Sequence, residues 1–406
     1  MSKTYEMDGV SLLFPALGGH LYRMTAVFNE NVDSKKLRKA IANLADAFPI
    51  MFTHLDKTFS GYIHRKANDY DVIVDGEKWI NTPSLTDTVK PSFRVYVDKN
   101  LFSVDFFHGN ADGHIANAFM SALVDSYCAL LENKVMPVLP VPSDFDLEDP
   151  YDVFYRKSKT NNVLEKPSYE LKLKKEPYEY HRLACFEMDI NEVKSFTKKY
   201  GCSINDFLCA IYYKAIIDAT SAKNSKKDVT LSIGIDLRKF YDCNTHRNFD
   251  YYCNIRFNES CKNSFDNTIK TIRHQVKNAL KAKNVMSGVG VVHNTAHNPI
   301  VKYSPRVLKD FVVKNCYHAV YDTGITSTIS NIGYHKVSDD SKKHLKRMEL
   351  YLNIFDKKVN AAAVGCKDKL TLNLTYNSKD KTIDEALGKI IKSFGINYSY
   401  SQREFY

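Results

Sequence analysis

The stretch that decides the interpretation of this chain lies between residues 106 and 113 and reads Phe106-Phe107-His108-Gly109-Asn110-Ala111-Asp112-Gly113. Before it, residues 101–107 are apolar and have the composition of a strand. After it, residues 114–131 are strongly apolar and are predicted to form a helix. His108 is therefore expected at the end of a strand, where a side chain can face a cleft rather than the core.

Each polar residue of this stretch has a chemical interpretation and a structural one. A neutral imidazole accepts a proton near pH 7, as a general base must, so His108 is a candidate catalytic residue. Asp112 is suited to hold the loop by pairing with a cation or with backbone amides, and Gly113 allows a close or left-handed backbone approach. The structural alternative is a satisfied loop histidine followed by a helix-capping aspartate, and the stretch alone does not decide between them.

Working outward, strands and helices alternate on both sides. Before the stretch we predict a strand over 21–28, a helix over 34–47 capped by Asp33 or Ser34, and short strands over 50–54, 61–64, 70–74 and 93–97. Beyond residue 180 we predict strands over 181–190, 229–235, 251–257, 326–330, 349–354, 359–365 and 369–376, and helices over 191–200, 204–220, 264–283, 299–316 and 382–394. Ser203 is the expected N-cap of the second of these helices.

Six of the twelve prolines lie between residues 134 and 180. Proline fixes φ and removes a hydrogen-bond donor, so this density predicts an irregular connector. We therefore expect an α+β protein of two halves, with an N-terminal part over 1–145, a proline-rich crossover over 146–180 and a C-terminal part over 181–406.

Composition excludes several classes of protein. The 406 residues are 44% hydrophobic and 26% charged, which is typical of a folded chain of about two domains. There is no apolar run of about 18 residues for a membrane span and no apolar signal region near Met1. Nine cysteines without a Cys-x-x-Cys pair predict reduced thiols in a cytoplasmic protein. The net charge of +10 would suit an anionic ligand, but without a dense basic block we predict no nucleic-acid partner.

One histidine pair has the spacing of helical metal ligands, His293 and His297. It has no accompanying zincin glutamate and no obvious third ligand, and the asparagine-rich setting before Pro299 suggests a loop. We therefore predict no metal site.

The pattern His108-x-x-x-Asp112-Gly113 resembles the active-site signature of the CoA-dependent acyltransferase superfamily, which includes chloramphenicol acetyltransferase and peptide condensation domains. The resemblance extends along the chain and is nearest to bacterial alcohol acetyltransferase-like proteins. Four further segments carry it: residues 13–16 (LFPA), 203–208 (SINDFL), 235–249 with its Asp-Leu-Arg and Arg-Asn-Phe, and 328–333 (TISNIG). The sequence differs at Phe107, where many relatives have a second histidine, and the plant Asp-Phe-Gly-Trp-Gly motif is absent.

This resemblance implies two chloramphenicol acetyltransferase-like subdomains, each a two-layer α/β sandwich, with a tunnel at their interface. His108 would be the general base, and Asp112 would pair with Arg238 in a structural role together with Gly113. The candidates for lining the tunnel or binding substrate are Asn110, Asn248, Ser330 and Asn331. Ser330 and Asn331 could also donate to the oxyanion, and their alternative is a polar strand-end turn. Arg247 and Asn248 could bracket phosphates or the acceptor, and their alternative, which the sequence favours, is a solvated loop.

The function implied is transfer of an acyl group, expected to be acetyl, from a CoA thioester to a small-molecule alcohol or amine. Acetyl-CoA would be a co-substrate, with no permanently bound cofactor. Two alternatives remain: a stand-alone condensation-type enzyme that takes its acyl group from an acyl carrier protein, and a non-catalytic binding relative of the same fold.

Overall fold

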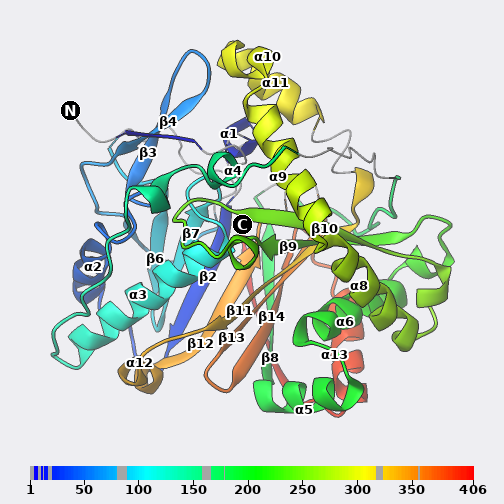
Figure 1. The fold of residues 1–406 in the computed structure, drawn as a ribbon. Helices are drawn as coiled ribbons and strands as arrows, with labels where there is room; N and C mark the ends of the chain where they lie inside the picture. The colour runs from blue at the N-terminus through cyan, green and yellow to red at the C-terminus, as the bar shows by residue number, and fades with distance from the viewer. Residues whose placement is uncertain are drawn as a thin grey trace.

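The computed structural model describes residues 4–7, 11, 13–16, 21–79, 89–157, 166–177, 179–316, 323–354 and 357–406. In these residues the strands form three sheets, of five, seven and three strands. The five-stranded sheet belongs mainly to the N-terminal half and the seven-stranded sheet to the C-terminal half (Figure 1).

The five-stranded sheet has the order β12-β2-β7-β6-β5. Its strands are β2 (Leu21–Phe28), β5 (Ile73–Asp75), β6 (Arg94–Asp98), β7 (Leu101–Phe107) and β12 (Leu345–Leu352). Helices α2 (Ser34–Asn43) and α3 (Gly113–Leu131) contribute buried residues to the core on this sheet. The small sheet, in the order β1-β4-β3, consists of β1 (Thr4–Glu6), β3 (Thr53–Lys57) and β4 (Tyr62–Lys66).

The seven-stranded sheet has the order β10-β9-β11-β13-β14-β8-β15. Its strands are β8 (His181–Asp189), β9 (Val229–Asp236), β10 (Asp250–Phe257), β11 (Ser327–His335), β13 (Val359–Cys366), β14 (Lys369–Tyr376) and β15 (Tyr398–Phe405). Only β11 runs parallel to its neighbours, β9 and β13; the other pairs are antiparallel. The helices of this half include α5 (Ile190–Tyr200), α6 (Ile204–Ala219), α8 (Phe265–Ala279) and α13 (Thr382–Ser393), whereas α12 (Asp339–His344) contacts α3 and β12 of the other half.

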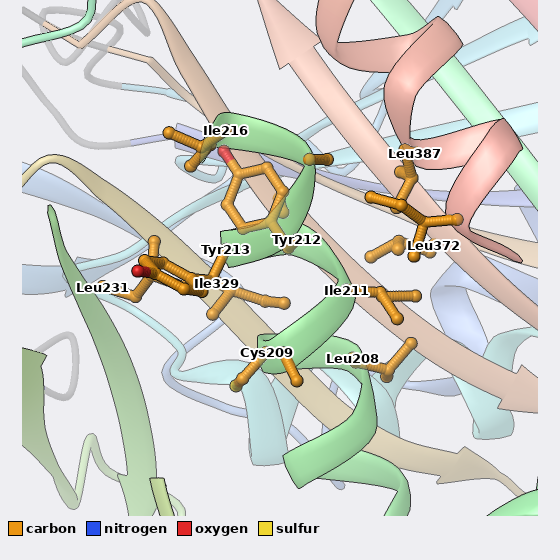
Figure 2. Packing of buried hydrophobic residues seen from close by; sticks show 14 of the residues in the cluster. Leu208, Cys209, Ile211, Tyr212, Tyr213, Ile216, Leu231, Ile329, Leu372 and Leu387 are labelled. Carbon is orange, nitrogen blue, oxygen red and sulfur yellow. The ribbon is translucent and has the colours of Figure 1, made fainter. Parts of the chain in front are cut away.

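The core of the C-terminal half is built around α6. Figure 2 shows Leu208, Ile211 and Tyr212 of this helix packed with side chains from β9, β11, β14 and α13, among them Leu231, Ile329, Leu372 and Leu387. The helix begins where the sequence predicts, because Ser203 and Asp206 form a capping box that satisfies its first amides.

Strand β13 joins the two cores. Its residues alternate between the faces of the sheet, so Ala361 and Ala363 pack in the C-terminal core while Ala362 and Val364 pack in the core of the N-terminal half. Every residue of β13 is buried as a result. Its neighbour in space, β12, leaves the C-terminal part of the chain and pairs antiparallel with β2. The halves are therefore interlocked rather than merely adjacent.

Most predicted elements are present, but three expectations were wrong. The helix predicted over 264–283 is α8, and a separate helix, α9 (Ala282–Ala296), follows it where the sequence suggests a loop around His293. The helix predicted over 299–316 is divided into α10 (Pro299–Tyr303) and α11 (Arg306–Cys316), because Ser304 precedes Pro305 and takes an extended conformation. Strand β15 was not predicted, since its polar residues 399–404 lack the apolar alternation of a half-buried strand.

The crossover forms little regular structure among its described residues. It contains the one-turn η1 (Phe145–Leu147) and α4 (Pro150–Val153), which has a proline in its first turn and Asp149 as N-cap. The other short helical segments of the described residues are α1 (Leu13–Ala16), α7 (Arg238–Tyr241), η2 (Ser221–Asn224) and η3 (Glu259–Cys261).

Two further sequence predictions concern the cysteines and membrane-spanning helices. The eight cysteines whose side chains are described are all free thiols. Within the described ranges, no helix has both the length and the apolar character needed to cross a bilayer.

Candidate active site

His108 is the first residue after β7, at the strand end where the sequence predicts it. Its ring stacks on Phe14 at a centroid distance of 4.5 Å and an interplanar angle of 22°. The edge of Tyr22 meets it at 5.2 Å and 68°. The residue is half-buried, its Nδ1 is buried, and two aromatic rings hold the imidazole in place.

The main chain at His108 is clamped by Asn248, which comes from the loop between β9 and β10. The Asn248 amide nitrogen Nδ2 donates to the carbonyl oxygen of His108 at 2.7 Å and to Ser11 Oγ at 2.7 Å. Asn248 and its neighbour Arg247 are both buried, and Arg247 donates to the carbonyl oxygen of Glu6. The interpretation of this pair as a solvated loop was therefore wrong, because the loop folds under the N-terminal segment and its polar groups find partners there.

Asp112 is the N-cap of α3, and its carboxylate has four hydrogen-bond partners. One oxygen, Oδ1, accepts from the amides of His114 (3.1 Å) and Ile115 (3.0 Å). The other, Oδ2, accepts from Arg238 Nη1 (2.8 Å) and from the Phe249 amide (2.9 Å). Burial by itself would raise the pKa of Asp112, but the Arg238 charge and the amide hydrogen bonds hold that pKa below its ordinary value. The carboxylate is thus ionised and fully occupied in joining the two halves.

Arg238 uses every part of its guanidinium group. Besides Asp112, Nη1 contacts Asp236 Oδ1 at 3.0 Å, Nε donates to the Thr245 carbonyl at 3.1 Å, and Nη2 donates to the Arg247 carbonyl at 2.6 Å. The structure therefore brings Asp112 and Arg238 together as the resemblance implies. It also explains why the loop of residues 242–249 is ordered around a single side chain.

A second contact between α3 and the end of β9 reinforces this junction. Asp236 Oδ2 lies 3.0 Å from His114 Nδ1, in the first turn of α3. Burial would raise the pKa of Asp236, but the hydrogen bond from His114 and the charge of Arg238 lower it well below its ordinary value. The start of α3 is therefore fixed to the C-terminal half by two carboxylates that share one arginine.

Gly113 is required by a close approach rather than by a left-handed conformation. A Cβ atom placed on Gly113 would lie 2.8 Å from Cγ2 of Ile332 in β11, too close for two carbon atoms. The first turn of α3 thus packs directly on the strand that carries Ser330 and Asn331.

Ser330 and Asn331 lie on this same strand, two positions and one position before Ile332, and are half-buried. Ser330 pairs in register with Ala362, and a bulge follows at Asn331, whose Oδ1 accepts from the Gly333 amide at 3.0 Å. Both residues therefore lie inside β11, next to its bulge and beside the start of α3, so the alternative of a strand-end turn was wrong. Any further role toward a substrate remains a prediction.

Asn110 is turned into the protein. Its Nδ2 donates to the carbonyl oxygen of Ile50 at 3.0 Å, and the side chain is buried. The described contacts therefore assign it to holding the loop after His108 against the segment before β3, while its predicted part in lining a tunnel remains a prediction.

Two contributors were not found from the sequence. The Tyr22 hydroxyl donates to the carbonyl oxygens of Ala111 (2.9 Å) and Asp112 (3.0 Å), and Phe14 supplies the stacking partner of His108. Burial raises the pKa of Tyr22 well above its ordinary value, so it remains a donor. Phe14 lies in the LFPA segment that carries the resemblance, but no local signal marks either residue as a contact of this loop, because each contact spans about 90 positions of the chain.

A cavity of about 540 Å³ lies elsewhere. It is lined by residues of α6, α8 and α13, among them Lys214, Phe265 and Lys389, and by none of the residues above.

Comparison with solved structures identifies the fold. TRI101 of F. graminearum, complexed with coenzyme A and deoxynivalenol, superimposes with a TM-score of 0.66 at 12% identity, covering 98% of this chain and 100% of that one. The TRI3 trichothecene 15-O-acetyltransferase of Fusarium sporotrichioides gives 0.61 at 10% identity, covering 96% and 93%. The epimerization domain of tyrocidine synthetase B, TycB3(E), gives 0.57 at 11% identity, covering 97% and 95%. No protein-family model and no curated sequence matches this chain.

These likenesses show the fold that the sequence resemblance predicted. The chain has the fold of the CoA-dependent acyltransferases and condensation-type domains, with two chloramphenicol acetyltransferase-like α+β halves. Its His108 loop, Asp112 and Arg238 lie where these two halves meet.

Proposed function

We propose that this protein is an acyltransferase that moves an acyl group, expected to be acetyl, from a CoA thioester to a hydroxyl or amine of a small molecule. The observation that carries the proposal is the His108 loop. His108 is half-buried at the end of β7, and its main chain is held from the opposite half by Asn248. The shared fold with the TRI3 acetyltransferase and with coenzyme A complexes of TRI101 supports the same activity.

In the proposed reaction His108 accepts the proton of the acceptor hydroxyl or amine as that atom attacks the thioester carbonyl. The tetrahedral intermediate then collapses, the carbon–sulfur bond breaks, and His108 returns the proton to the CoA thiolate. Both substrates meet at one base, so no acyl-enzyme is needed. Ser330 and Asn331 are the proposed donors to the oxyanion, in a tunnel between the halves.

Asp112 does not serve as a partner of the His108 ring in this scheme. Its two oxygens already accept four hydrogen bonds from His114, Ile115, Phe249 and Arg238. The carboxylate instead fixes the loop geometry, since it anchors the residue four positions after the base to the other half. A cytoplasmic location remains part of this proposal.

The test is release of free CoA thiol from acetyl-CoA across a panel of alcohols and amines. We expect His108→Ala to lower kcat by a factor of about 10² to 10⁴, the usual contribution of a general base. His274→Ala, which removes an exposed histidine of α8, should retain the rate of the unmodified protein. Full activity of His108→Ala would disprove the role of this residue.

The same assay separates the alternatives. If an acyl group on a carrier protein is transferred and acetyl-CoA is not, the protein is a condensation-type enzyme. If no donor is consumed but CoA or an acceptor binds, it is a non-catalytic relative of the fold.

A further inference from the structure

A cluster of three side chains with metal-binding groups lies far from His108 in the chain, between α4 and the end of α9. Asp152 comes from α4, and His293 and His297 come from the last turn and the C-cap of α9. One potential ligand atom from each residue lies within 4.8 Å of the other two. Asp152 and His293 are 141 positions apart in the sequence, so only the fold brings these groups together.

The sequence concealed this cluster for two reasons. The residues around His293 suggested a loop, whereas α9 is helical through Ala296, so the four-residue spacing places both imidazoles on one face. The ring centroids of His293 and His297 are 4.3 Å apart at 23°. The missing third ligand is Asp152, which only the folded crossover brings to this face.

The orientation of each imidazole suits a ligand. His297 Nδ1 lies 3.0 Å from the carbonyl oxygen of His293, so Nδ1 carries the proton and Nε2 keeps its lone pair. A backbone carbonyl in this position is the usual outer partner of a metal-binding histidine. The His293 ring stacks on Tyr155 at 3.8 Å and 10°, which holds its Nδ1 toward Asp152.

The spacing of the ligand atoms also fits. His293 Nδ1 is 2.9 Å from Asp152 Oδ1, and His297 Nε2 is 3.6 Å from Asp152 Oδ2. The second distance is too long for a good hydrogen bond. Ligands about 2.0 to 2.1 Å from a tetrahedral zinc ion are about 3.3 Å apart, between these two values.

We propose that Asp152, His293 Nδ1 and His297 Nε2 bind one divalent transition-metal ion of the Zn²⁺ type, with water completing the coordination. Two imidazoles and a carboxylate form a donor set that suits such ions, whereas Mg²⁺ and Ca²⁺ prefer oxygen ligands alone. The proposal does not depend on the acyl transfer proposed above.

A metal ion at this site would link the crossover to the C-terminal half. Tyr151, beside Asp152, donates its hydroxyl to the Asp250 carbonyl (2.7 Å) and packs edge-on against Phe249 at 5.3 Å. The Phe249 amide in turn holds Asp112. A bound ion would therefore stiffen α4 at the point where the crossover supports the loop of residues 242–249.

The experiment is a calorimetric titration of the full chain with Zn²⁺. The protein carries no polyhistidine tag, and its metal is first removed with EDTA, which is then dialysed away. We expect about one ion per chain, and an affinity about 100-fold or more weaker in His297→Ala, which removes one ligand. Co²⁺ should give the visible absorption of a four-coordinate site in the unmodified protein and not in this variant. His274→Ala, an exposed histidine of α8, is the matched control and should bind as the unmodified protein does.

A second variant keeps the result interpretable. Asp152→Ala should also lose binding, and circular dichroism in EDTA should show that both variants keep the fold, because Asp152 and His297 are exposed. Zn²⁺ should raise the Tm of the unmodified protein and of His274→Ala only. The proposal is overturned if Zn²⁺ does not bind the unmodified protein, or if His297→Ala and Asp152→Ala bind it with unchanged affinity.

Discussion

The buried ion pair between Asp112 and Arg238 allows a prediction that can be worked out in some detail. The two residues are 2% and 4% exposed, and their charged groups are 2.8 Å apart. Arg238→Ala would leave the Asp112 carboxylate with its three amide donors but without a countercharge. It would also remove the side-chain donors of two carbonyl groups, those of Thr245 and Arg247. Removing one partner of a buried pair typically costs about 3 to 5 kcal/mol, and we expect this variant to lose that much.

The loss should appear as a lower Tm. Unfolding entropy is about 2.1 cal/mol/K per residue, so for 406 residues a loss of this size lowers the Tm by about 4 to 6 °C. The Tm of Arg238→Lys should lie between those of Arg238→Ala and the unmodified protein, since lysine keeps the charge but not the donors to Thr245 and Arg247. Lys239→Ala, which removes the exposed neighbouring charge, should stay within about 0.5 kcal/mol of the unmodified protein.

The size of the loss should depend on pH. In the unmodified protein the pKa of Asp112 is below its ordinary value, so the group contributes stability above that ordinary value and loses it as pH falls through the folded pKa. In Arg238→Ala, burial is no longer opposed by the arginine and raises the pKa of Asp112, so the carboxyl group takes a proton at higher pH. The protonation of Asp112 in the variant reduces the difference between the two proteins as pH falls from 7 toward 4, and the loss in the unmodified protein reduces it further only below the ordinary pKa of an aspartate.

Urea unfolding followed by circular dichroism and fluorescence at several pH values measures this difference. A loss in Arg238→Ala below about 1 kcal/mol at pH 7 would refute the assignment of Arg238 as the countercharge that this buried carboxylate requires. A loss of the expected size that stays constant with pH would refute the electrostatic explanation and favour a packing defect.

Three further predictions concern the supports of the candidate site. Gly113→Ala should destabilise the protein by about 1 to 3 kcal/mol, because the new methyl group meets Ile332, and thermal unfolding should show most of that loss relieved in an Ile332→Ala background. Tyr22→Phe should cost about 0.5 to 1.5 kcal/mol in urea unfolding, since the carbonyls of Ala111 and Asp112 lose their hydroxyl donor; unchanged stability would show that the bond is not needed. Ser203→Ala should cost about 1 kcal/mol by removing the N-cap of α6, and an equal Tm for the two proteins would contradict the capping box seen there.

Much of the candidate site was predictable because its signals are local. The change from an apolar strand to a polar turn and then to an apolar helix predicts where His108 lies, and Asp112 caps α3 through amides two and three residues away. The pairing of Asp112 with Arg238 was expected only through the resemblance to known acyltransferases. The burial of Asn248 was not expected, because its partner, the His108 carbonyl, is 140 positions away.

The errors in predicting the fold also come from contacts between residues that are distant in the sequence. Strand β15 is too polar to show a strand pattern by itself, yet it pairs with β8 along its whole length because β8 presents a free edge there. The loop predicted around His293 is a helix whose inner face packs through Val285 and Val289 against Leu237 and Phe249. In both cases the tertiary environment outweighed weak local preferences.

The sequence by itself determined most local units of this protein: the majority of its strands and helices, the caps of α2, α5 and α6, and the position of His108 at the end of a strand. Those features depend on sterics and hydrogen bonds within a few residues. Only the tertiary structure decided which units meet, as when β12 joins the N-terminal sheet, β13 serves both cores, and Asp152 reaches His293. Such contacts depend on sheet register and on the packing of whole elements, which no short stretch of residues specifies.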